Sequence, residues 1–91
     1  MIPKHHGAKL TDIPDDSLAE ILSVAKRIAK ASGADNYNIL QNNGKLAHQM
    51  VDHVHFHVIP RSAGVDLGMH ARGMVDPRTL EPIAAKIRSA L

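Results

Sequence analysis

Residues 53–60 read HVHFHVIP, so histidine occupies every second position before the run ends on a proline. Side chains two residues apart point to the same face of a β-strand. A strand here would present His53, His55 and His57 together and turn the intervening hydrophobic side chains the other way. Three titratable rings side by side give up the packing that a strand prefers and repel one another when protonated. The pattern therefore favours a chemical role over a purely structural one.

A helix is expected before this segment. Residues 14–32 carry hydrophobic side chains at the spacing of one helical face, with lysine and arginine mostly on the other face. Ser17 and Glu20 have the spacing of a capping box, and Gly33 is a typical helix terminator. These signals predict one long helix over residues 14–32.

Two strands are expected next. Residues 35–41 alternate in the manner of a strand, and Asn-Asn-Gly at residues 42–44 is a strong turn signal because these residue types tolerate positive φ. Residues 45–50 have no clear period and lead to a second strand over residues 51–59, which Pro60 stops. We expect the two strands to pair antiparallel through a short connection.

The C-terminal third is expected to be a loop followed by a helix. Residues 62–79 contain three glycines and no regular period, which is typical of a loop, although Met69 and Met74 in it have the character to cover a site. Helical spacing returns in a segment that predicts a short helix over residues 78–90, with Pro82 allowed only in its first turn or before it.

Length and charge limit the class of protein. Ninety-one residues make a single domain, residues 1–91, with one small core, and the 2% aromatic content makes that core lean. The net charge of +2 is interspersed along the chain, so no nucleic-acid partner is expected. The chain has no signal-peptide start and no run of roughly 20 apolar residues, so we expect no membrane partner and a soluble, intracellular protein of the cytoplasm or nucleus.

The residues alone leave two chemical interpretations open. Histidine is a common zinc ligand, but positions i and i+4 of a strand lie about 13 Å apart, so an ion would use only two of the three rings. The chain has no cysteine, which excludes disulfides and thiolate zinc sites. In the other interpretation, a neutral imidazole attacks a phosphorus centre and forms a covalent intermediate that water later cleaves.

Several motifs together carry a family resemblance. YNILQNNG at 37–44, AHQ at 47–49 and HVHFHVIPR at 53–61 resemble the histidine triad (HIT) family, most closely its Hint-like branch, and IPKHH at 2–6 is similar to the segment that precedes the helix in that family. The resemblance implies an α+β fold in which one long helix packs on an antiparallel sheet, plus a short C-terminal helix. It also implies a partial HIT-like domain that lacks the family's N-terminal helix and strand pair, and a homodimer.

The activity implied by the resemblance is hydrolysis or transfer at the α-phosphate of nucleoside phosphoramidates or related AMP conjugates, through a nucleotidyl-histidine intermediate and with no metal or cofactor. By motif position, His55 is the nucleophile, and His53 and His57 complete the catalytic set. The implied substrate contacts are Asn42, which reaches the phosphate, and Gln49, His48 and His6 around the pocket.

Two departures from the family pattern bear on the activity. His48 and Met50 flank Gln49 where the family often has glycine and a serine or glutamate, which removes a hydroxyl that assists the leaving group in some members. The missing N-terminal segment would weaken nucleotide affinity and turnover. The alternative function is a non-catalytic HIT-fold interaction protein or a histidine-based metal binder.

Overall fold

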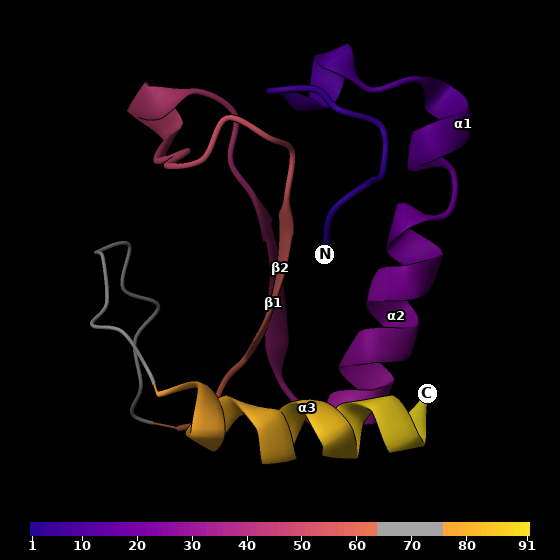
Figure 1. Cartoon of the computed structure of the whole chain (residues 1–91), viewed down its shortest axis with the longest axis vertical. Helices are drawn as coiled ribbons and strands as arrows, with labels where there is room; N and C mark the ends of the chain where they lie inside the picture. Colours follow the sequence, from indigo (N-terminus) through magenta and orange to yellow (C-terminus); the bar gives the residue numbers. More distant parts are fainter. Residues whose placement is uncertain (64–75) are drawn as a thin grey trace.

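The computed structural model of the chain describes residues 1–63 and 76–91 (Figure 1). Within these residues a two-stranded sheet stands beside an upright helix, and a second long helix runs across one end of the first (Figure 1). The elements in chain order are the 3-10 turn η1 (Leu10–Asp12), α1 (Asp15–Leu18), α2 (Ile21–Ser32), β1 (Tyr37–Gln41), the 3-10 turn η2 (Lys45–Ala47), β2 (Phe56–Pro60) and α3 (Pro77–Ala90).

The predicted α+β class and the antiparallel strand pair are confirmed. β1 pairs with β2 so that Tyr37 lies opposite Pro60 and Gln41 lies opposite Phe56. The second strand begins at Phe56, however, and not at Val51 as predicted. The connection between the strands is therefore long and contains η2, so the prediction of a short hairpin connection was wrong.

The late start of β2 follows from where β1 ends: Gln41, the last residue of β1, lies opposite Phe56, so residues 51–55 have no partner on β1. Met1 and Phe56 exchange two backbone hydrogen bonds of 2.8 Å, and the Val54 amide donates to the Gly7 carbonyl at 2.8 Å. Val54, just before β2, therefore bonds to the N-terminal segment, and Phe56 pairs with β1 on one edge and with Met1 on the other. These first residues lie beside β2 on the side toward α2 (Figure 1).

The long helix predicted over residues 14–32 is interrupted. α1 ends at Leu18 and α2 begins at Ile21, although Ala19 and Glu20 between them keep right-handed helical torsion angles. Glu20 has φ −97° and ψ −6°, the turn-like bridge region, which breaks the regular hydrogen-bond ladder.

Of the two end signals predicted for that helix, the N-terminal capping box was wrong and the C-terminal glycine was confirmed. The capping box was wrong, because Ser17 lies inside α1 and Glu20 makes no side-chain cap bond. Gly33 does end α2, with φ 74° in the left-handed region that favours glycine.

The predicted C-terminal helix is confirmed, one residue earlier at its start. α3 starts at Pro77, and the Asp76 carboxylate caps it by accepting from the Arg78 amide at 2.9 Å. Pro82 lies inside the helix, so the expectation that it would fall in the first turn or before it was wrong. The predicted loop residues Met69 and Met74 lie outside the described residues.

The core is small, as the composition predicts. Its buried hydrophobic side chains are Ile13, Ala25, Ala29 and Val54, and Val54 is fully buried. α2 packs against both β2 and α3, and its two alanines permit that close approach. Among the described residues, no helix is both long enough and apolar enough to cross a bilayer.

Candidate active site

The three histidines do not share one strand face, contrary to the prediction. Only His57 lies in β2, whereas His53 and His55 precede the strand. The His55 and His57 rings meet edge to face with centroids 5.0 Å apart, but the His53 ring stacks on His6 at 5.2 Å. The His53 ring contacts the N-terminal segment through His6 and Pro3. The four rings therefore form two pairs, His53 with His6 and His55 with His57.

The His55 ring has a defined orientation. Its Nδ1 lies 2.7 Å from the carbonyl oxygen of His53. A carbonyl oxygen only accepts, so Nδ1 carries the proton and the neutral ring keeps its lone pair on Nε2. This backbone contact therefore leaves Nε2 as the basic and nucleophilic atom of His55.

His53 joins the site to the N-terminal segment. Its Nε2 lies 3.2 Å from the Pro3 carbonyl oxygen, and its Nδ1 lies 3.2 Å from Nδ1 of His6. Because the carbonyl accepts from Nε2, the neutral His53 ring accepts at Nδ1 from the protonated Nδ1 of His6. Both rings are thus held by the same short stretch, in which Pro3 is buried.

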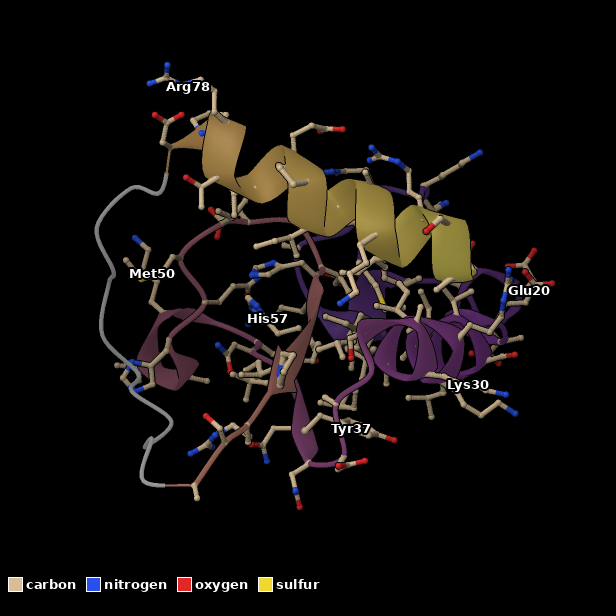
Figure 2. The ribbon with its side chains drawn as sticks, turned by 90° about the horizontal axis from the view of Figure 1, so that it is seen from below. Glu20, Lys30, Tyr37, Met50, His57 and Arg78 are labelled. Atoms are coloured by element: carbon tan, nitrogen blue, oxygen red, sulfur yellow. The ribbon has the colours of Figure 1, made fainter. Side chains whose placement is uncertain are left out.

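His57 is the exposed member of the second pair, and Figure 2 shows it beside β2 near the middle of the molecule. Partial burial lowers its pKa from the usual 6.5, and the neighbouring His55 and the N-terminal ammonium lower it further. A lowered pKa favours the neutral ring, which donates a hydrogen bond from one nitrogen and accepts at the other. The His57 ring, favoured in its neutral form, therefore lies against the oriented His55 ring.

The loop between the strands carries the remaining predicted residues. The Asn42 side chain donates to the His48 carbonyl at 3.4 Å, and His48 itself is exposed with φ 66°. Gln49 is buried and bonds to backbone groups of Gly44, Ala8 and Val51. A direct contact from Gln49 to a substrate stays a prediction.

Some residues that hold the site were missed by sequence reasoning. The carbonyls of Pro3 and Gly7 accept from the His53 ring and the Val54 amide, and a backbone carbonyl has no residue-type signature. Gly7 did carry a signal, since a Cβ at this position would lie 2.6 Å from Cδ1 of Ile13. A lone glycine directly after IPKHH is consistent with such a close approach.

Two other features of the described residues compare poorly with the histidines as sites. A cavity of about 330 Å³ lies at the far end of the strand pair, lined by Asn36, Arg61, Ser62 and Ala63, and none of its lining residues is a histidine. Within residues 1–63 and 76–91, no group of three or more histidine, aspartate or glutamate side chains is arranged to hold a metal ion. The imidazole pairs remain the best candidate site.

The chain is thus an α+β protein in which a backbone carbonyl orients the His55 ring and the His57 ring contacts it edge to face. Residues 1–64 match the HIT domain model, and the chain belongs to the HIT family, in its Hint-like branch.

Curated relatives and a solved structure agree with this membership. The chain is 66% identical over 61 residues to adenosine 5'-monophosphoramidase HNT1 of Saccharomyces cerevisiae, covering 67% of this chain and 39% of the relative. It is 51% identical over 82 residues to the HNT1 enzyme of Candida albicans, covering 78% and 54%. A Hit-like protein from Bartonella henselae superposes with a TM-score of 0.88 at 35% identity, over 99% of this chain and 68% of that one. The matched region spans about half or less of the length of these curated relatives.

Proposed function

We propose that this protein is a nucleotide hydrolase or transferase that cleaves nucleoside phosphoramidates or related AMP conjugates at the α-phosphate. The observation that carries the proposal is the 2.7 Å contact from Nδ1 of His55 to the His53 carbonyl, because it leaves the Nε2 lone pair free to attack. The names of the S. cerevisiae, Schizosaccharomyces pombe and C. albicans relatives, all adenosine 5'-monophosphoramidases, support the substrate class.

The proposed reaction has two displacements. Nε2 of His55 forms a bond to the α-phosphorus while the phosphorus–nitrogen bond breaks, and the amine leaves with a proton taken from the solvent. Water then attacks the phosphorus of the nucleotidyl-histidine and returns a proton to the solvent, and the histidine leaves with its lone pair restored. The net reaction consumes one water and releases an amine and a nucleoside monophosphate.

The other predicted residues have roles in this scheme. His57 and the Asn42 amide donate to the phosphate oxygens, which favours the extra negative charge of the transition state. His53 orients His55 through its carbonyl, and His6 supports the His53 ring. His48, whose carbonyl already accepts from Asn42, borders the substrate.

A homodimer is part of the same proposal. β1 pairs only with β2 within the described part of the chain, and Tyr37 and Ile39 on it are exposed. An unpaired strand edge with apolar side chains is usually covered by association. Analytical ultracentrifugation of the chain tests this expectation directly.

The activity is tested by incubating the chain with an adenosine phosphoramidate and measuring the release of AMP. His55→Ala should reduce the rate by roughly 10³-fold or more, because it removes the attacking group. Mass spectrometry of an early quenched reaction should find the nucleotidyl group on His55 in the wild type only.

His5→Ala is the matched control. His5 is an exposed histidine in the same IPKHH segment, and it has no part in the proposed mechanism. Its rate should stay within about twofold of wild type. A wild-type chain that releases no AMP but still dimerises would support the non-catalytic alternative, and stoichiometric zinc that depends on His53 and His55 would support a metal binder.

A further inference from the structure

Gln49 is a buried polar side chain whose hydrogen-bonding groups are all engaged by backbone. It is 3% exposed, and its Nε2 donates to the Ala8 carbonyl at 2.5 Å and to the Val51 carbonyl at 2.9 Å. Its Oε1 accepts from the Gly44 amide at 2.7 Å. One amide therefore joins three separate points of the backbone.

Gly44 is shaped to receive this side chain. It has φ 89° and ψ 158°, a conformation that is almost restricted to glycine. Its amide bonds to the Gln49 side chain, and its carbonyl accepts from the Gln49 backbone amide at 3.0 Å. The two residues thus close the loop 44–49 into a ring.

This ring lies directly beside a predicted phosphate contact. Asn42 precedes Gly44 by two residues, and its side chain donates to the carbonyl of His48, the residue before Gln49. A shift of the ring would therefore displace both the backbone of Asn42 and the acceptor of its side chain.

The third bond of Gln49 connects the ring to the other half of the site. Ala8 follows Gly7, whose carbonyl accepts from the amide of Val54, between His53 and His55. The loop with Asn42 and the backbone with His55 are thus both attached to the same two residues of the N-terminal segment.

We propose that Gln49 is a positioning residue that holds Asn42 in register with His55 and acts through the loop, without touching the substrate. The inference rests on the proposed function. Turning Gln49 toward a leaving group would instead break all three bonds of the buried Gln49 side chain and leave the partly buried Gly44 amide without this partner, which is unfavourable.

A double-mutant cycle with Gln49→Met and Asn42→Ala tests the proposal. Methionine has a similar length but makes none of the three bonds. Gln49→Met should lower kcat by roughly 10- to 100-fold with little change in KM, because a small misplacement costs rate more than binding. Adding Asn42→Ala should then cost much less than it does in the wild type.

Additive effects would overturn the proposal. So would a loss on Gln49→Met that grows or shrinks with the leaving group, since that dependence indicates direct contact with the substrate. Circular dichroism and the melting temperature should first show that the variant is folded. Hydrogen exchange of the Gly44 amide should be faster in the Gln49→Met variant, because this amide loses its acceptor. An unchanged exchange rate would contradict the positioning role of Gln49.

Gln49→Glu separates the donor bonds from the acceptor bond. Glutamate keeps the acceptor for Gly44 but donates only when protonated, and burial raises the pKa of a carboxyl group. Its rate relative to wild type at the same pH should rise as pH falls. If the ratio of the Gln49→Glu rate to the wild-type rate does not change with pH, the two donor bonds of Gln49 do not contribute to the rate.

The proposed function and this inference fail in different ways. If the wild-type chain releases no AMP, the proposed function is wrong. The positioning role of Gln49 is then tested by the NMR resonances of the Asn42 side-chain amide. A change in these resonances on Gln49→Met supports this role, and unchanged resonances overturn it.

Discussion

The half of the molecule that carries the histidines and the half made of helices are held together in different ways. The site half, residues 1–9 and 42–58, is fixed by hydrogen bonds between residues 41 to 55 positions apart, such as Gln49 to Ala8 and Met1 to Phe56. The helical half, α2 and α3, buries only Ala25 and Ala29, and α3 has no buried residue.

The difference has a consequence for function. Hydrogen bonds are directional and fix the distance between two groups, whereas contacts between small apolar side chains stabilise without fixing orientation. Substitutions in the helical half should therefore lower stability and leave the rate per folded molecule intact. Substitutions in the site half should change both.

The largest effect on stability is expected at Val54. This fully buried side chain lies between His53 and His55, and Val54→Ala should cost about 2 kcal/mol in the free energy of unfolding through lost burial and the cavity left behind. Urea denaturation measures the loss. AMP release per folded molecule should also fall, because the histidines share this backbone, and an unchanged rate would contradict the link between packing and site geometry.

A smaller effect is expected at the end of α2. Gly33 has φ 74°, and a Cβ added to it would meet nothing within 4 Å, so Gly33→Ala should cost about 1 kcal/mol from backbone strain alone. Gly33→Asn is the matched control, since asparagine tolerates this conformation better. The rate per folded molecule should be unchanged in both variants, and a lower rate would break the distinction between the halves.

A still smaller effect is expected on α3. Ile83 is 55% exposed, so Ile83→Ala should change the free energy of unfolding by less than about 0.5 kcal/mol. Thermal denaturation beside Val54→Ala gives the comparison. A loss as large as that of Val54→Ala would mean that Ile83 is covered in solution, for example in a dimer.

The elements that local signals specify were predicted from the sequence. The alternation over residues 35–41 indicated β1, which runs from Tyr37 to Gln41, and Gly33 indicated the end of α2. The predicted start of β2 was wrong because residues 51–55 lie beyond the end of β1 at Gln41, and Val54 among them bonds to the distant residue Gly7. No local pattern reports such a distant partner, so alternation alone placed His53 and His55 in a strand.

The candidate site was predicted by residue type better than by geometry. The alternating pattern singled out the three histidines, and the structure does place the His55 and His57 rings together. Whether a polar side chain contacts substrate or backbone depends on packing, and for Gln49 the three backbone partners only become visible in three dimensions. The stacking of His6 on His53 likewise depends on the path of the N-terminal segment.

The most subtle expected effect concerns the charge of His57. Burial, the neighbouring His55 and the N-terminal ammonium lower its pKa below 6.5, so an NMR titration of its ring should have a midpoint below 6.5. His55→Ala should raise the midpoint toward 6.5, because it removes a neighbouring positive charge. An unchanged midpoint would mean that His55 does not lower the pKa of His57.

The lowered pKa of His57 also predicts how the free energy of unfolding changes with pH. Between the lowered pKa of His57 and the value of 6.5 in the unfolded chain, the unfolded state binds more protons, so the free energy of unfolding should fall as pH decreases through this window. Urea denaturation at a series of pH values measures the slope, and His57→Gln should reduce it. Because His57 belongs to the site half, Gly33→Asn in the helical half should leave the slope unchanged, and an equal reduction in both variants would remove the assignment to His57.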